Sequence, residues 1–121
     1  RLNGLGVEPV KGGLSPFDLK RVSALIEARL VNPPSLHELA DEIGVSKRHF
    51  CRAFKQSTGK TPFAYLAHVR LTRAIDLLRA TQRSTTEIAH ECGFSSSSHF
   101  AYAFKRAYGA GPFEFRKRWR I

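Results

Sequence analysis

The sequence predicts an all-α fold built from two related helical subdomains. Apolar residues recur at helical spacing from residue 15 onward, helix-capping signals stand before most of these runs, and no strand pattern longer than chance occurs. The chain has 121 residues, which is the size of one ordinary domain or two very small ones. Because 42% of the residues are hydrophobic, the chain can build a core and wholesale disorder is not expected.

The start of the chain is expected to be a flexible linker or tail, because residues 1–14 are rich in glycine and show no periodicity. From its position, we expect another domain ahead of this segment. The first helix is predicted to begin at Ser15–Pro16, where an N-cap serine is followed by proline at the first helical position. It ends before Asn32–Pro34, because proline cannot continue a helix.

Three further helices are predicted in the first half of the chain. Ser35 and Glu38 have the spacing of a capping box and open a short helix. Gly44–Val45 makes a tight turn, and the helix of 46–59 follows with serine as its cap and glycine at its end. Thr61–Pro62 starts a long helix that extends to about Ala80.

The apolar positions of these helices predict their buried faces, since residues three and four apart lie on the same side of a helix. The expected core residues are Phe17, Val22, Leu25, Ile26, Leu30, Leu36, Leu39, Ala40, Ile43, Phe50, Ala53, Phe54, Phe63, Leu66, Ala67, Leu71, Ala74, Ile75 and Leu78.

The second half of the chain repeats the first at a period of about 50 residues. At an offset of 49, the pairs are Ser35/Ser84, Glu38/Glu87, Ala40/Ala89 and Gly44/Gly93. At an offset of 50, they are Phe50/Phe100, Phe54/Phe104, Lys55/Lys105, Gly59/Gly109 and Pro62/Pro112. One extra residue therefore lies in the second turn. Ile88, Ala89, Cys92, Phe100 and Phe104 are expected to face inward in the second repeat. Two repeats are too few for a solenoid, so we expect one subdomain over 15–68, including the start of the central helix. A second is expected over 69–121, including a final short helix from Pro112.

Each repeat has the order of a helix-turn-helix motif: a short capped helix, a glycine turn and a second helix. Charge is sorted between the two helices. The first carries Glu38, Asp41 and Glu42, whereas the stretch 46–60 holds Lys47, Arg48, Arg52, Lys55 and Lys60 with no acid. The second repeat separates Glu87 and Glu91 from Lys105 and Arg106 in the same way. The major groove of DNA admits one helix flanked by phosphates, which an acid-free second helix suits.

The net charge of +10 points to a polyanionic partner, either nucleic acid or an anionic membrane surface. There are two alternatives to a DNA-binding domain. One is a basic helical module for a membrane surface or protein partner, and the other is an enzyme acting on nucleic acid. No nucleophile elbow, phosphate loop or paired-carboxylate pattern occurs, so no enzyme and no cofactor are expected. His49-x-Cys51 and His90-x-Cys92 are about 200° apart on a helix and cannot hold a metal ion together. With no signal peptide and no apolar run of about 18 residues, we expect a soluble, cytoplasmic protein.

These motifs resemble the DNA-binding domain of the AraC/XylS family of transcription regulators, over about residues 15–118. The most specific stretch is IAHECGFSSSSHFAYAFKRAYGAGPFEFR (88–116), with its Ile-Ala, Gly-Phe, Phe-Lys, Gly and Pro at fixed spacing. LADEIGVSKRHFCRAFKQSTGKTPFAYL and RLTRAIDLL also fit. The resemblance implies seven helices, with two helix-turn-helix subdomains joined by a long central helix. It also implies that both recognition helices, the second helix of each motif, enter consecutive major grooves on one face of the duplex.

The resemblance also assigns residues. Base-facing positions fall on Arg48, Cys51 and Arg52 in the first recognition helix, and on Ser97, Ser98, Ala101 and Tyr102 in the second. Phosphate contacts are expected from Lys47, Lys55, Lys60, Thr61, His99, Lys105 and Arg106. Arg52 is the strongest candidate for base readout, because arginine makes a bidentate contact with guanine. Family members often carry arginine where this chain has Tyr102, so we expect the first repeat to supply most of the discrimination.

The expected function is therefore that of a sequence-specific, double-stranded DNA-binding domain in a bacterial transcription regulator. The resemblance implies a nucleoid-associated activator that binds promoter DNA, contacts RNA polymerase and oligomerises through a domain ahead of Arg1. No membrane partner is expected. The basic C-terminal end, RKRWRI, is predicted to be frayed.

Overall fold

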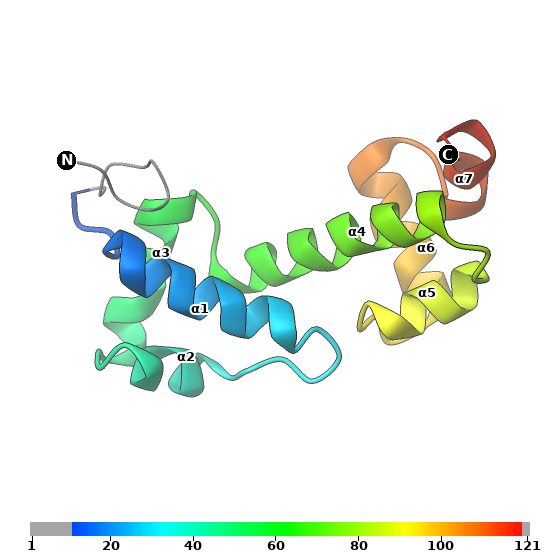
Figure 1. Ribbon diagram of the computed structural model, residues 1–121. Helices are drawn as coiled ribbons and strands as arrows, with labels where there is room; N and C mark the ends of the chain where they lie inside the picture. The colour runs from blue at the N-terminus through cyan, green and yellow to red at the C-terminus, as the bar shows by residue number, and fades with distance from the viewer. Residues whose placement is uncertain (1–10, 120–121) are drawn as a thin grey trace. The chain divides into compact units, whose positions relative to one another are not determined.

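The computed structural model describes residues 11–119, and these form seven helices and no strand (Figure 1). The helices are α1 (Pro16–Ala28), α2 (Leu36–Glu42), α3 (Lys47–Thr58), α4 (Pro62–Ala80), α5 (Thr85–Glu91), α6 (Ser97–Tyr108) and α7 (Pro112–Trp119). The all-α fold of seven helices is confirmed. Of the predicted tail, residues 1–10 lie outside the described part of the chain, as do Arg120 and Ile121.

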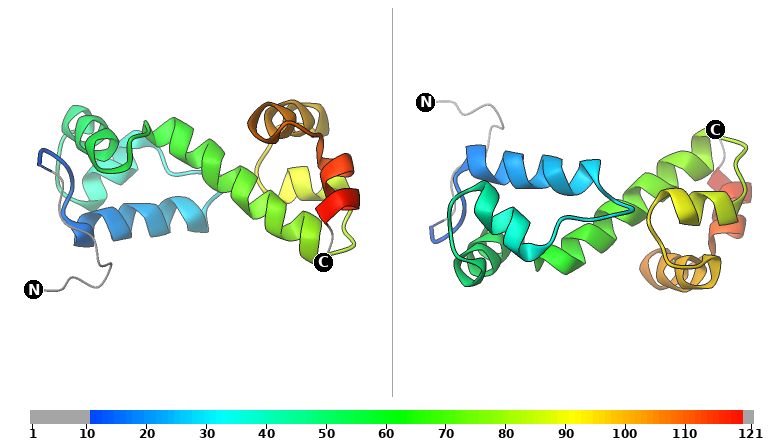
Figure 2. Two further views of the ribbon diagram at one scale, coloured as in Figure 1. Left: turned by 90° about the horizontal axis from the view of Figure 1, so that it is seen from above. Right: turned by 90° about the horizontal axis from the view of Figure 1, so that it is seen from below.

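The chain forms two compact units. The first contains the described residues up to Arg29 together with Pro33–Leu66, and the second contains Leu30–Asn32 and the residues from Ala67 onward. Each unit holds one helix-turn-helix pair, α2 with α3 and α5 with α6, as both views of Figure 2 show. The passage from the first unit to the second lies within α4.

Serine side chains start five of the helices, at the positions predicted from the sequence. Two of these starts are reciprocal capping boxes, Ser35 with Glu38 and Ser84 with Glu87, in which each side chain accepts a backbone N–H of the other residue. The remaining caps are Ser15, Ser46 and Ser96. Removing such a cap typically costs about 1 kcal/mol. The start of each recognition helix is thus fixed by its own local sequence.

The core of the first unit lies between α1, α2 and α3. Phe50 and Phe54 of α3 are both fully buried, with ring centroids 5.4 Å apart, and Tyr65 of α4 meets Phe54 edge-on at 5.2 Å. Leu14, which precedes α1, is also buried in this cluster, and its N–H donates to Ser57 Oγ of α3 at 2.8 Å. The apolar face of α3 is therefore anchored, which leaves its opposite face outward.

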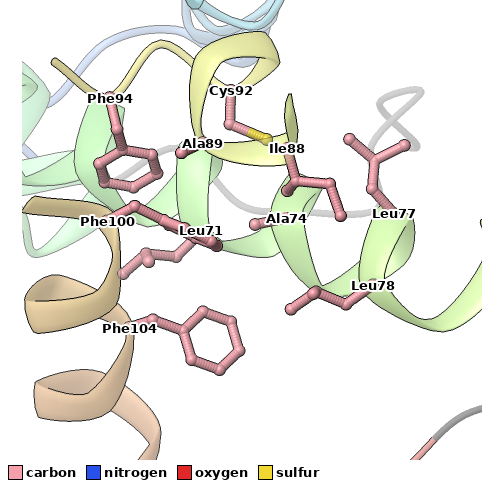
Figure 3. Packing of buried hydrophobic residues seen from close by; sticks show 10 residues of the cluster. All are labelled: Leu71, Ala74, Leu77, Leu78, Ile88, Ala89, Cys92, Phe94, Phe100 and Phe104. Carbon is pink, nitrogen blue, oxygen red and sulfur yellow. The ribbon is translucent and has the colours of Figure 1, made fainter. Parts of the chain in front are cut away.

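The core of the second unit is arranged in the same way around α6 (Figure 3). Phe100 and Phe104 of α6 pack with Phe94 from the turn, with the C-cap residue Cys92 of α5, and with residues of α4 and α5, which are Leu71, Ala74, Leu77, Leu78, Ile88 and Ala89. Cys92 is fully buried, as predicted, and His90 is exposed. Leu77 was not predicted, because it lies at the edge of the apolar stripe of α4.

Three predicted core residues are exposed instead. Phe17 is 68%, Leu36 38% and Phe63 80% exposed, so their placement in the core is wrong. Each lies in the first turn of its helix, where the apolar stripe extends past the elements that pack against it. The guanidinium of Arg21 lies over the ring of Phe17, 5.6 Å from the ring centroid. At the start of α4, Pro62 is the buried residue beside the exposed Phe63.

The prediction of a frayed C-terminal end is wrong as far as Trp119, because α7 continues to that residue. The guanidinium of Arg116 donates to the carbonyl oxygens of Leu77 and Leu78 in the last turn of α4, and of Thr81 and Arg83 just beyond it. Helix C-termini leave carbonyl groups without partners and carry partial negative charge, so an arginine there is favourable. Arg116 therefore joins α7 to α4 within the second unit.

Candidate nucleic-acid interface

The two helix-turn-helix turns are closed by equivalent backbone hydrogen bonds. Val45 N–H donates to Ala40 O at 3.1 Å, and Phe94 N–H donates to Ala89 O at 2.9 Å. Both alanines are 1% exposed, so the paired helices approach closely. The second turn has Ser95 as its extra residue before the cap Ser96, as the change of repeat offset predicted. These bonds fix how each recognition helix leaves its turn.

The outward face of α3 is basic. Phe50, Ala53 and Phe54 are buried, and positions two residues from Phe50 point about 200° away from it. Arg48, Arg52 and Lys55 are exposed there, at the i, i+4 and i+7 spacing of one stripe, and Lys47 is exposed at the helix start. The helix holds no acidic residue.

Cys51 lies at the edge of this face. Its side chain is half-buried and packs against the core of the first unit. Only part of the thiol therefore reaches the surface on which Arg48 and Arg52 lie.

The outward face of α6 is smaller in its side chains and less charged. Ser97, Ser98 and Ala101 are all exposed on it. Tyr102 is 66% exposed on the side opposite Phe100, and Arg106 follows one turn later with its Nη1 3.5 Å from the phenol oxygen. Lys105 and Arg106 give the last turn its positive charge. The seven predicted base-facing residues thus lie on the outward or bordering surface of the two recognition helices.

The first turns of α3 and α6 carry no acidic residue, whereas those of α1, α2, α5 and α7 each carry one. The partial positive charge of a helix N-terminus attracts anions, so these two starts suit a phosphate. His99 lies there, with its Nδ1 3.3 Å from Ser95 Oγ and its ring edge-on to Phe94.

His49 has the same place in α3 and was not predicted as a site residue. The backbone N–H of each histidine donates to the Oγ atom of the serine that caps its helix, at 3.1 Å for His49 and 3.0 Å for His99. The offset of 50 residues between them is the signal that pairs the two.

Three of the five acidic residues of α2 and α5 are paired with arginines outside the recognition helices. Glu42 binds Arg21, Glu91 binds Arg83, and Glu38 accepts from Arg29 at 2.9 Å. Between residues 11 and 119, none of these ion pairs involves a basic side chain of α3 or α6. Exposed pairs contribute little stability, but these keep carboxylates away from the recognition helices.

The Ser35 N–H and the Arg29 guanidinium lower the pKa of Glu38, which holds this carboxylate in its charged form. The capping box of α2 is therefore stabilised by charge as well as by geometry.

The segment between α3 and α4 holds Lys60 and Thr61. Lys60 is exposed, and Thr61 Oγ1 accepts the N–H of Ala64 at 3.1 Å, which starts α4. The second repeat has Gly111 at the place of Thr61, and its N–H donates to Glu114 at 3.4 Å. The start of α7 is thus acidic where the start of α4 is not.

Other kinds of site find little support in the described residues. No group of three or more histidine, cysteine or carboxylate side chains within 11–119 could hold a metal ion. Burial raises the pKa of the Cys92 thiol to about 11, so it stays protonated as a core residue at neutral pH. None of the helices described is both long and apolar enough for a membrane span.

Comparison with known proteins agrees with this geometry. The helix-turn-helix domain family matches residues 39–118. The transcriptional activator RhaS of Enterobacter sp. (strain 638) is 39% identical over 99 residues, which cover 82% of this chain and 36% of RhaS. RhaS of Escherichia coli (strain K12 / DH10B) is 37% identical over the same coverage. The chain thus spans about a third of the length of these curated relatives.

Solved structures show the same fold. An AraC-type DNA-binding regulator from Chromobacterium violaceum has a TM-score of 0.78 and 37% identity, over 84% of this chain and 90% of that one. The DNA-binding domain of AdpA, solved with a target DNA, has a TM-score of 0.76 and 31% identity, over 84% and 91%. From the family match and these relatives, the chain belongs to the helix-turn-helix family, as a DNA-binding domain of the AraC type of transcription regulator.

Proposed function

We propose that the chain reads a specific double-stranded DNA site by inserting α3 and α6 into consecutive major grooves. The observation that carries this proposal is the pair of outward helix faces without acidic residues, each opposite a phenylalanine core. A recognition helix must bring its side chains to the base edges while phosphates border it on both sides. One chain carries both helices, so a monomer would read an asymmetric site.

In this proposal α3 supplies most of the sequence discrimination. Arg52 lies opposite the core and has two donors for the O6 and N7 atoms of guanine. Arg48, one turn earlier, contacts either a second base or a phosphate. Cys51 offers only an apolar contact, such as one to a thymine methyl group, since it is half-buried. Lys55 follows on the same stripe and binds a phosphate.

The helix α6 serves mainly to anchor the second unit. Ser97, Ser98 and Ala101 have small side chains, so they have little reach toward the base edges. Tyr102 occupies a position at which an arginine side chain would reach further. Phosphate contacts come from basic or polar groups around both helices, namely Lys47, Lys60, Thr61, His99, Lys105 and Arg106. The structure of AdpA with its target DNA supports duplex binding by a domain of this fold.

The larger regulatory role is inferred from relatives of greater length. RhaS is described as an activator, and this chain covers 36% of it. We infer that the chain is the DNA-binding part of a promoter-bound activator that works in the cytoplasm, at the nucleoid. Contact with RNA polymerase and oligomerisation through a further domain belong to the same proposal. The chain itself is a binding domain and not an enzyme.

A selection of bound duplexes from a random pool tests the function directly. The selected site then allows Arg52→Ala to be compared with Lys20→Ala, which removes the same charge from an exposed position of α1. We expect Arg52→Ala to reduce discrimination between the selected and a scrambled site by about 1–3 kcal/mol. Lys55→Ala should weaken binding to both duplexes alike and lower the salt slope by about 1.

Fluorescence anisotropy at two salt concentrations measures all of these effects. If Arg52→Ala leaves the discrimination ratio unchanged, or if Tyr102→Ala lowers it more, the roles given to α3 and α6 are wrong. If the selection yields no preferred duplex, sequence-specific binding itself is refuted.

A further inference from the structure

We propose that Arg106 makes the hydroxyl of Tyr102 act only as a hydrogen-bond donor. As a result, α6 prefers a keto base, guanine or thymine, over an amino base, adenine or cytosine. This inference rests on the proposed function, since it needs α6 in a major groove. It concerns the part of the site where the side chains of α6 otherwise offer little discrimination.

The geometry begins with the position of Tyr102 on the helix. Phe100 is 1% exposed and faces the core, so Tyr102, about 200° further round, is directed away from the core. Arg106 lies four residues later and therefore on the same side. Its Nη1 atom is 3.5 Å from the phenol oxygen, at the long end of hydrogen-bond distances. Both side chains are exposed, so this pair lies on the outward face of α6.

The chemistry of the two groups sets the direction of the phenol hydrogen. A guanidinium has five N–H donors and no acceptor, so the phenol oxygen can only accept from it. The positive charge beside the oxygen also attracts its lone pairs and repels its hydrogen, even at the longer distance. The single O–H of Tyr102 is therefore directed away from Arg106. What Tyr102 presents to a partner is a donor.

The base edges of the major groove distinguish a donor from an acceptor. Guanine O6 and thymine O4 accept a hydrogen bond, whereas the adenine N6 and cytosine N4 amino groups donate one. A donor-only hydroxyl pairs with the keto oxygens and meets another donor at the amino groups. A polar group that loses its partner on burial is unfavourable, so the amino bases are disfavoured at the contacted position.

The first repeat has the same two positions with different residues. Arg52 and Gln56 of α3 correspond to Tyr102 and Arg106 of α6 at the offset of 50 residues. In α3 the arginine itself takes the base-facing position, while in α6 the arginine lies one turn later and orients a tyrosine. Arginine is also a donor only, so both helices present donors at equivalent places. Tyr102 has one donor, so it would pair equally well with the keto oxygen of guanine or of thymine. The guanidinium of Arg52 has two parallel donors and therefore favours guanine.

The test is a selection with the intact chain on duplexes randomised in the half-site protected by α6. The readout is the ratio of keto to amino bases at each position, for the wild type and four variants. We expect a ratio of roughly tenfold at one position for the wild type, equal to about 1.4 kcal/mol. Tyr102→Phe should abolish this preference. Arg106→Lys should retain it, because an ammonium group is also a donor only.

Arg106→Glu is the decisive variant. A carboxylate accepts the phenol hydrogen, which leaves the oxygen lone pairs to face the base, so the preference should move toward amino bases. Lys105→Glu is the matched control, since it makes the same charge change one residue away. It should weaken binding similarly and keep the keto preference.

Equal base ratios for the wild type, Arg106→Glu and Tyr102→Phe would overturn the inference while leaving the proposed function intact. A selection in which no duplex is enriched at all would instead refute the proposed function. Far-UV circular dichroism of each variant confirms that the helices are formed, so a change in base ratio is not confused with unfolding.

Discussion

Replacing Gly93 by alanine should destabilise the second unit much more than replacing Gly44, its counterpart in the first. Both glycines lie in a helix-turn-helix turn with positive φ, 93° and 73°. A Cβ atom at Gly93 would lie 2.1 Å from Leu30 O, 2.8 Å from Leu30 C and 2.9 Å from Arg70 Nε, whereas one at Gly44 meets nothing within 4 Å. The two substitutions thus share the backbone strain and differ in the collision.

The expected magnitudes follow from these contacts. The left-handed conformation costs a non-glycine residue about 1–2 kcal/mol, which is the whole cost expected for Gly44→Ala. At Gly93 the Leu30 carbonyl must also move, and it accepts from Arg70 Nε at 3.1 Å and from Nη2 at 2.7 Å. Hydrogen bonds to a charged group contribute about 1.5–3 kcal/mol, so Gly93→Ala should cost about 2.5–5 kcal/mol when the backbone strain is added. Burial lowers the pKa of Arg70, because its guanidinium is partly desolvated.

Urea unfolding followed by far-UV circular dichroism, which detects the helices of both units, measures the difference, and tryptophan fluorescence reports on the second unit. Trp119, the single tryptophan, lies in α7 of the second unit and packs near Phe115, with ring centroids 6.4 Å apart. A double-mutant cycle with Arg70→Met isolates the collision, because that substitution should cost less once Gly93→Ala has already broken the Arg70–Leu30 bonds. The reasoning is refuted if Gly93→Ala is no more destabilising than Gly44→Ala, or if the two changes are additive.

Three further outcomes are expected. In urea unfolding, Arg116→Ala should lower the free energy of unfolding by about 2–4 kcal/mol, because the carbonyl groups at the end of α4 lose their charged donor. Arg116→Lys should not restore the lost stability. Iodoacetamide followed by mass spectrometry should label Cys51 well before the buried Cys92, and a cognate duplex should protect Cys51; faster labelling of Cys92 would contradict its burial. The pKa of Glu38 is lower in the folded state than in the unfolded state, where it is about 4.3. The carboxylate therefore stabilises the protein at pH values above the unfolded-state pKa, and this stabilisation is lost as the pH falls through the folded-state pKa. Glu38→Gln should therefore destabilise at pH 7 and make no difference near pH 2, measured by thermal unfolding at both values.

The sequence by itself determined the helices and the outward faces of the recognition helices. Caps such as Ser35 with Glu38 act within four residues, and the Phe50 and Phe54 spacing assigns the inner side of α3. The positions of Arg52 and Tyr102 on the opposite side follow from the same helical period. The Tyr102–Arg106 pair is also a local i, i+4 relation, so the sequence contained its signal.

Only the tertiary structure decided which of these faces is covered and by what. Helical spacing gives the direction of a side chain but not the presence of a neighbour, which is why Phe63 proved exposed and Cys51 half-buried. Arg70 meets the carbonyl of Leu30 at a separation of 40 residues, and Arg116 meets that of Leu78 at a separation of 38. Such contacts depend on how packed helices bring distant backbone groups together, and no local pattern in the chain encodes them.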